Sequence, residues 1–475
     1  MEGAGSTGSS TQILPSRGLG GGGGAVRESR DRFNLVQFAN NKPIWKCFKR
    51  IPTKVEWSNF RKYTRRMHKL KISGFDETVS LETLLALQFH TTNEHFLPRL
   101  RVFKCGDVGQ HLTSFIPFFL SSQITYIHIN FSTELDAVGI ASIISRFPTL
   151  CPNLERIVIA PLEISPVITD VVSSMLLASR GSLRTFCVRS PLTKEAQDVV
   201  YRLPNLSQLR VVIQEHIPLP PIKLPNLVSI YIIFDVDHSW LEAFRGAPFE
   251  KLDTVIFRSE SGGTGDFLEA FERVALTTSI RYTLSTFKFS TLRAWTPNYH
   301  PLLSFNKLSS LEIYLPCVEP CSSGVGDDVI AAIARAMPKL EVLRLGGTPC
   351  QAVTGATVKR LIEPSSRCPR LSELRIHFQA GSLVDAARKA RKPLFLDDGP
   401  VDQPEDCALK ILEVGETPIP LDSARSVPTI ALFLLQIFPR IISIEFDKFN
   451  LEWEQVAETL QDFRQFGAYV RRKSE

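Results

Sequence analysis

The sequence predicts an α/β solenoid, with short parallel strands along a concave face and helices over the convex face. Three observations support this fold class. The apolar motif Leu-x-x-Leu-x-Leu, with any apolar residue allowed at its three fixed positions, recurs along the chain. A proline often stands two residues before it, and helical patterns separate many of the copies. Each copy is predicted to bury its apolar side chains against the neighbouring copies.

The motif occurs fourteen times, at intervals of 21 to 38 residues. After the first position, apolar and polar residues alternate with a period of two, as in a strand that has one buried face. The clearest pair is LPNLSQLRV at residues 203–211 and LPNLVSIYI at residues 224–232. We therefore predict one strand in each unit. The units start at Met67, Leu100, Ile124, Leu154, Leu183, Leu206, Leu227, Leu252, Leu284, Leu308, Leu340, Leu371, Leu409 and Ile441.

Proline precedes the first apolar position by two residues in seven units. The positions are Pro98, Pro152, Pro204, Pro225, Pro338, Pro369 and Pro439. Proline fixes φ and lacks an N–H group, so it suits a point where a helix has ended and the chain turns into an extended segment.

Helical patterns lie between many of the strands, for example at residues 76–89, 134–147, 265–276 and 327–337. Several begin with an acidic residue and end near arginine or proline, which suits the charges of helix ends. The most apolar stretch, residues 429–438, is too short to cross a bilayer and is predicted to be a buried helix. Strand, helix and proline-marked return together indicate a leucine-rich repeat solenoid, a right-handed horseshoe. Its unequal steps predict a distorted horseshoe with helices of unequal length.

Four segments are predicted along the chain. Residues 1–30 are rich in Gly and Ser and are expected to be disordered. Residues 31–66 form a basic, aromatic N-terminal cap, in which aromatic residues spaced by three or four pack an amphipathic helix onto the first unit. Residues 67–450 form the solenoid. Residues 451–475 form a C-terminal capping helix and tail, because solenoids need covered ends.

Composition restricts the classes of protein that fit. The net charge of +6, from 55 basic and 49 acidic residues, is small for 475 residues, so nucleic acid is not a favoured partner. Nine cysteines without a CxxC pair favour a reducing compartment over a disulfide framework. Residues 1–30 contain no secretory apolar run. We expect a soluble protein of the cytoplasm or nucleus that does not bind a membrane.

The sequence also predicts a partner-binding surface. In each strand, the residue between the two final apolar positions should point to the concave face. Most of the charged residues in this series and at neighbouring positions are basic, tyrosines lie between them, and the last two in the series are Glu413 and Glu445. Such a face suits an acidic or phosphorylated protein segment. The alternative is that these are ordinary solvated strand residues. The predicted contacts are Lys71, Lys104, Tyr126, His128, Arg156, Arg210, Tyr231, Arg258, Lys288, Arg344 and Arg375.

Motifs for catalysis, metals or cofactors are not found. Cys317 and Cys321 lack a second pair of ligands at zinc-finger spacing. The glycine-rich residues 259–266 have no following Lys-Ser or Lys-Thr, and GxSxG and HExxH are absent. The basic run RKARK at 388–392 suits a charged surface loop, with a nuclear-localisation signal as the alternative. We therefore expect no enzymatic activity and no cofactor.

The segment VEWSNFRKYTRRMHKLKI, residues 55–72, carries a family resemblance. It resembles the segment that joins the F-box to the repeats in fungal, especially mushroom-type, F-box leucine-rich-repeat proteins. The similarity extends over roughly residues 43–475 through the CPNL and LPNL units. An F-box opens on Leu-Pro-x-Glu and contains a Cys-Arg-x-Trp-like phrase, and residues 1–41 contain neither. The matching residues are Glu56, Trp57, Phe60, Tyr63, Arg65, Arg66 and Leu70.

Three hypotheses for function follow. The resemblance implies a substrate receptor of an SCF-type cullin–RING ubiquitin ligase, bound through a Skp-type adaptor. The second hypothesis is a stand-alone protein-interaction scaffold without ligase association. The third is an RNA- or nucleotide-dependent regulator that uses the basic residues 42–71, a stretch with eleven Lys and Arg residues and one acidic residue, Glu56.

Overall fold

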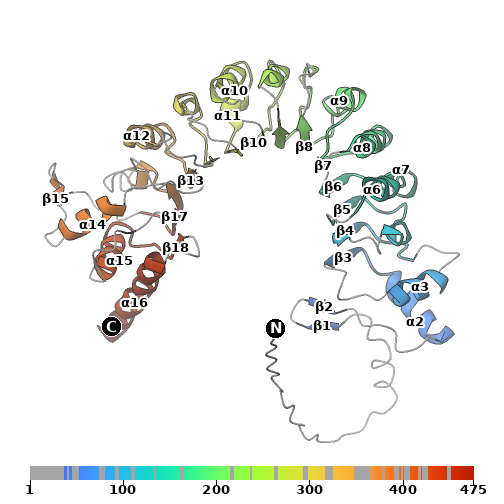
Figure 1. Cartoon of the computed structure of the whole chain (residues 1–475), viewed down its shortest axis with the longest axis horizontal. Coiled ribbons are helices and arrows are strands. Elements are labelled where there is room, and N and C mark those ends of the chain that lie inside the picture. Colours follow the sequence, from blue (N-terminus) through green and yellow to red (C-terminus); the bar gives the residue numbers. More distant parts are fainter. Residues whose placement is uncertain are drawn as a thin grey trace, which may run out of the picture.

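A computed structural model gives the architecture of the chain as an open arc (Figure 1). It describes residues 37–39, 42–44, 53–73, 81–90, 96–108, 113–132, 135–160, 165–213, 219–235, 238–260, 266–292, 298–315, 325–346, 364–365, 367–376, 380–389, 395–396, 399–400, 407–415, 419, 426–446 and 451–474. The predicted disordered segment 1–30, the cysteines Cys317 and Cys321, and most of the loop after residue 389 lie outside these ranges.

A fourteen-stranded parallel sheet runs through the described part of the chain, with neighbouring strands in sequence order. Each of its strands begins two residues after the first position of a predicted unit, which confirms the fourteen predicted strands. The strands are β3 (Lys69–Ser73), β4 (Val102–Val108), β5 (Tyr126–Phe131), β6 (Arg156–Ala160), β7 (Thr185–Val188), β8 (Gln208–Ile213), β9 (Ser229–Phe234), β10 (Thr254–Ser259), β11 (Thr286–Thr291), β12 (Ser310–Tyr314), β13 (Val342–Leu345), β14 (Glu373–Ile376), β17 (Ile411–Gly415) and β18 (Ser443–Phe446).

Helices follow most of the strands. In Figure 1 the strands line the inner side of the arc, and α6 to α12 lie on its outer side. The α-helices are α2 (Lys54–Thr64), α3 (Leu81–His90), α5 (Ile116–Phe119), α6 (Ala137–Ile144), α7 (Phe147–Leu150), α8 (Pro166–Ser179), α9 (Lys194–Val200), α10 (Phe267–Leu276), α11 (Ile280–Thr283), α12 (Asp327–Ala336), α14 (Ala380–Lys389), α15 (Ser426–Ile437) and α16 (Leu451–Ser474). Two 3₁₀ helices, η1 (Ser239–Phe244) and η2 (His300–Ser304), replace α-helices after β9 and β11. The sheet and its flanking helices form an α/β, solenoid-like arrangement, and the convex elements are of unequal length, as predicted.

Two short antiparallel pairs stand outside the main sheet. One joins β1 (Gln37–Ala39) to β2 (Lys42–Ile44), and the other joins β15 (Phe395–Leu396) to β16 (Gly399–Pro400). Neither pair was predicted from the sequence, because two or three residues are too few to establish an alternating pattern.

The seven prolines occupy the same place in a recurring turn. In the unit that begins at Leu154, the Leu154 N–H donates to the carbonyl of Cys151, with Pro152 between them. The same bond from the first apolar residue to the carbonyl three residues earlier spans each of the other six prolines. Proline is therefore the second residue of a tight turn, where its fixed φ is preorganised. This turn sets the start of the strand and explains the spacing of two residues.

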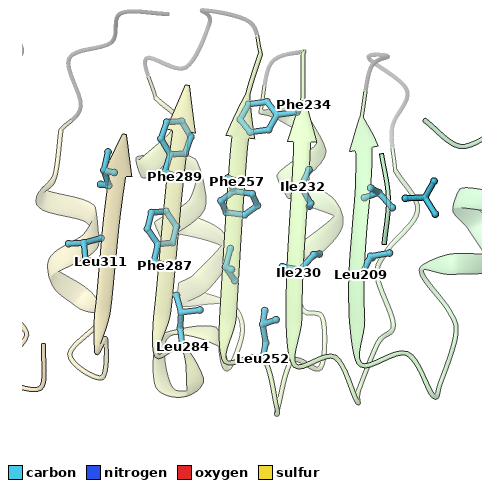
Figure 2. Packing of buried hydrophobic residues seen from close by; sticks show 14 of the residues in the cluster. Leu209, Ile230, Ile232, Phe234, Leu252, Phe257, Leu284, Phe287, Phe289 and Leu311 are labelled. Atoms are coloured by element: carbon cyan, nitrogen blue, oxygen red, sulfur yellow. The ribbon is translucent and has the colours of Figure 1, made fainter. Parts of the chain in front are cut away.

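The core is a ladder of apolar side chains between the sheet and the outer elements. Equivalent residues on adjacent strands lie side by side, as Figure 2 shows for Leu209, Ile230, Phe287 and Leu311 on β8, β9, β11 and β12. These four side chains are buried. No unit can bury its apolar face alone, so each strand depends on its neighbours for stability.

The N-terminal end of the sheet is covered by α2. Thr53 and Glu56 form a capping box at its start, since the Thr53 Oγ1 accepts from the Glu56 N–H and the Glu56 Oε2 accepts from the Thr53 N–H at 2.7 Å. Trp57 is buried, and Phe60 packs between Trp57 and Phe96, with ring centroids 5.5 and 5.6 Å away. The predicted amphipathic helix against the first units is therefore present.

The C-terminal end is covered by α15 and α16, which pack against each other. Trp453 on α16 is fully buried, and α15 contains the apolar stretch predicted to be a buried helix. The helix α16 extends to Ser474, so it occupies most of the segment that was predicted to be a capping helix and tail. Among the helices that the structure describes, none has both the length and the apolar composition needed to cross a membrane.

Candidate functional site

The central residues of the fourteen strands form one continuous row across the inner face of the sheet. The strand register pairs each of them with its neighbour on the next strand, without an offset in this row. We call it the central row. In order it contains Lys71, Lys104, His128, Val158, Cys187, Arg210, Tyr231, Ile256, Lys288, Glu312, Arg344, Arg375, Glu413 and Glu445.

The other predicted contacts lie beside this row on the same face. Tyr126 and Arg156 are paired two residues before it, on β5 and β6. Arg258 lies two residues after it on β10, next to Ile233 of β9. The structure therefore brings the eleven predicted residues onto one face, where they extend from β3 to β14.

Charges on the C-terminal half of the row are paired with one another. The Lys288 Nζ lies 2.7 Å from the Glu312 Oε1, and the Arg375 Nη1 donates to the Glu413 Oε1 at 2.5 Å. Arg344 lies among three carboxylates. Its Nη2 is 2.9 Å from the Glu373 Oε2, and its other nitrogens lie 3.9 Å from oxygens of Glu312 and Glu413.

Tyr314 hydrogen-bonds to both Glu312 and Arg344 in this network. Its hydroxyl donates to the Glu312 Oε2 at 2.9 Å and accepts from the Arg344 Nη1 at 3.2 Å. Burial alone would raise the pKa of Glu312, but the hydrogen bonds from Lys288 and Tyr314 and the charges of Lys288 and Arg344 lower it overall. Glu312 is therefore a buried, ionised carboxylate at neutral pH. The basic side chains of this half are already neutralised inside the protein.

The N-terminal half of the row is different, because its cations have no acidic partner among the described residues. Lys71 and Arg156 are exposed, and the structure gives neither an ion pair within the described part of the chain. The Lys104 ammonium lies 5.0 Å above the centre of the Tyr126 ring. Such a contact leaves the positive charge available to a ligand.

His128 lies between Lys104 and the β6 strand on this half. Burial lowers the pKa of His128, the hydrogen bond with Asn130 at 3.2 Å raises it, and the charge of Lys104 lowers it. The pKa is lowered overall from its usual 6.5, so the imidazole is neutral at pH 7. An anion bound here would favour its protonation.

The middle of the row is apolar apart from Arg210. Val158, Cys187 and Ile256 are half-buried, and the Arg210 guanidinium lies 4.3 Å from the centre of the Tyr231 ring. Burial raises the pKa of the Cys187 thiol to about 11, although the charge of Arg210 lowers it. The thiol is protonated at neutral pH and is a poor nucleophile.

Three charged residues on this face were missed in the sequence. Glu373 is the first residue of β14, and Arg189 and Glu260 directly follow β7 and β10. Continuing the alternation one residue beyond the motif to Arg189, and three residues beyond it to Glu260, would have placed both on the inner face. The predicted face was mainly positive and turned negative at its C-terminal end. In the C-terminal half the structure adds that Glu312, Glu373 and Glu413 form ion pairs with the basic residues.

Metal and thiol chemistry have little support among the described residues. No group of three or more His, Cys, Asp or Glu side chains there is arranged to hold a metal ion. The described cysteines Cys105, Cys151, Cys187, Cys368 and Cys407 are free thiols. The arrangement suits binding through charge and aromatic contacts.

Comparisons with known proteins do not assign this chain to a family. No protein-family model matches the sequence, and a search of curated proteins gives no match.

Proposed function

We propose that the protein is a non-catalytic recognition solenoid of the leucine-rich repeat type that binds an acidic segment of another protein. The segment lies on the inner face across β3 to β8. The observation that carries the proposal is the series of cations without acidic partners on these strands, namely Lys71, Lys104, Arg156 and Arg210. A curved parallel sheet offers such a series to an extended ligand.

The two halves of the face differ in their capacity for an anion. A new carboxylate near Arg344 would compete with three carboxylates that are already held there. Near Lys104 it would meet two neighbouring cations, Lys71 and Lys104, and would displace no carboxylate of the described residues. Electrostatic complementarity therefore favours β3 to β8.

The test uses charge reversal. A fluorescein-labelled twelve-residue peptide of alternating Glu and Gly should bind the full chain, as measured by fluorescence anisotropy at about 0.1 M salt. The variant Lys71→Glu/Lys104→Glu/Arg156→Glu should bind roughly tenfold to a hundredfold more weakly, because like charges then face the ligand. Higher salt should weaken wild-type binding.

The matched control reverses the same number of charges at exposed helix ends. Arg146, Arg180 and Arg202 are exposed and follow or precede α6–α9. The variant Arg146→Glu/Arg180→Glu/Arg202→Glu should keep most of the affinity. If both triple variants lose affinity equally, the attraction is a property of net charge, and the proposal of a specific face fails.

Binding of the Glu-Gly peptide should also depend on pH through His128. The pKa of His128 is lowered in the free protein, so the imidazole is neutral at pH 7. A bound anion would raise this pKa, and binding would therefore take up a proton. Affinity should therefore rise several-fold as pH falls from 7.5 to 5.5, where the peptide carboxylates stay ionised. The variant His128→Gln should show a flat profile. A wild-type profile that is equally flat would exclude His128 from the contact.

The proposed biological role is substrate recognition for a cullin–RING ubiquitin ligase, which rests on the resemblance of residues 55–72. Four of the seven matching residues have a structural role, since Glu56 caps α2, Phe60 packs against Phe96, and Trp57 and Leu70 are buried. Immunoprecipitation of the tagged protein from native cells, probed for the Skp-type adaptor and the cullin, tests this role. Recovery of both supports it. Recovery of neither, with other proteins retained, favours a stand-alone scaffold.

A further inference from the structure

An ionic bridge crosses the middle of the inner face. Arg189 directly follows β7, while Arg258 and Glu260 lie at the end of β10. The Arg189 Nη2 donates to the Glu260 Oε1 at 3.2 Å, and the Arg258 Nε lies 3.9 Å from the same oxygen. Because β8 and β9 lie between β7 and β10, the bridge spans two strands. Two guanidinium groups thus share one carboxylate oxygen.

The bridge passes over an apolar floor. Val212 of β8 and Ile233 of β9 are neighbours in the row that also contains Arg258. Their side chains point away from those of Val211 and Ile232, which face the core. They are nevertheless only 3% and 1% exposed. An ion pair over such a floor is shielded from water on one side, which strengthens its electrostatic interactions.

A third guanidinium lies next to the bridge. Arg210 precedes Val212 by two residues on β8, so the two side chains share a face. Its Nε is buried without a hydrogen-bond partner among the described residues. Three arginines from β7, β8 and β10 therefore lie on the same part of the inner face, and two of them, Arg189 and Arg258, lie against the one carboxylate that the bridge contains. Asp235, beside Glu260 at the end of β9, is exposed and forms no ion pair in the described part of the chain.

We propose that this bridge is the resting state of a phosphate-binding site, in which the Glu260 carboxylate occupies the place of a phosphorylated side chain of the bound segment. The inference rests on the proposed function, extends the bound segment from β8 to β10, and names the chemistry of the contact made there. Arg189 and Arg258 hold the phosphate, and Arg210 adds the third positive charge.

Because a ligand must displace Glu260 from the arginines, a phosphate group is favoured over a carboxylate of the partner. Glu260 is part of the same chain, so its effective concentration at the arginines is high and a monoanionic carboxylate from a partner gains little by replacing it. A phosphate monoester carries nearly two negative charges and three acceptor oxygens, and it matches two guanidinium groups. The displaced Glu260 moves to solvent, where it is hydrated.

The experiment compares two peptides on the full chain by fluorescence anisotropy. Both alternate Glu and Gly around a central serine, which is phosphorylated in one of them. Phosphorylation should tighten wild-type binding roughly fivefold or more. In Arg189→Gln/Arg258→Gln this gain should disappear, while the unphosphorylated peptide still binds through Lys71, Lys104 and Arg156. Glu260→Gln should tighten both peptides and reduce the preference for phosphate.

The matched control is Glu155→Gln, which removes a carboxylate 3.8 Å from Arg184, where the two residues directly precede β6 and β7. It should leave both affinities and their ratio unchanged. Equal wild-type affinity for the two peptides would overturn this inference and leave the proposed function intact. A phosphate gain that survives in Arg189→Gln/Arg258→Gln would also overturn it. Binding of neither peptide would overturn the proposed function, and this inference with it.

Discussion

Replacing Arg344 by glutamate should lower the free energy of unfolding by about 2–3 kcal/mol, since it puts a fourth carboxylate among Glu312, Glu373 and Glu413. The Arg344 side chain is 28% exposed, so water screens part of the repulsion and the loss stays below that of a fully buried ion pair. Burial alone would lower the pKa of Arg344, but Tyr314, Glu312 and Glu413 raise it, so the guanidinium is charged throughout. Urea unfolding followed by circular dichroism measures the change.

The control for this substitution is Arg370→Glu in the turn before β14. Arg370 is exposed and has no ion pair among the described residues, so its reversal should change stability by less than about 0.5 kcal/mol. A second variant, Arg344→Gln, should bind the Glu-Gly peptide as tightly as the wild type. Similar losses of stability in Arg344→Glu and Arg370→Glu would show that the network contributes nothing beyond general charge. Weaker peptide binding in a folded Arg344→Gln would place Arg344 in the binding surface.

Replacing Phe257 by alanine should cost about 3–5 kcal/mol, because it opens a cavity in the most aromatic part of the core. Phe257 is fully buried on β10, and its ring centre lies 5.1 to 6.1 Å from those of four others. These partners come from η1, α10 and β11, so the loss weakens the packing of two successive convex elements, η1 and α10, against the sheet. The partners are Trp240, Phe267, Phe271 and Phe287.

Two comparisons isolate the cavity effect. Phe257→Leu keeps much of the volume and should cost less than the alanine variant. Leu276→Ala, at a side chain 52% exposed at the end of α10, should be close to neutral. Equilibrium unfolding of all three variants measures the order of their losses in the free energy of unfolding. A cost below about 1 kcal/mol for Phe257→Ala would contradict the packing described for β10 and α10.

The strands could be predicted from the sequence because their signal is local. The period of two in each unit, and the proline that occupies the second residue of the preceding turn, involve fewer than ten consecutive residues. Pro152 before Leu154 is one example. The end of the helix α16 could not be predicted, because its last turns lack a strong apolar pattern and extend beyond Trp453 and the covered end of the sheet.

The central row could also be predicted, since it follows from strand periodicity and from a register without offset at this position. Its electrostatics could not be predicted in the same way. Lys288 and Glu312 lie 24 residues apart in sequence and are neutralised by each other only because β11 and β12 are adjacent. The sequence therefore predicted that both signs of charge occur toward the C-terminal end, but not which side chains pair.

The sequence by itself determined the unit, the strand positions and the central row of the inner face. Each of these is fixed by the alternation of side chains within one short segment. Only the tertiary structure decided which charges are free and which are paired. Arg189 and Glu260 are 71 residues apart and meet across two intervening strands. Such a contact depends on the distance between strands and the reach of the side chains, which no local pattern in the sequence encodes.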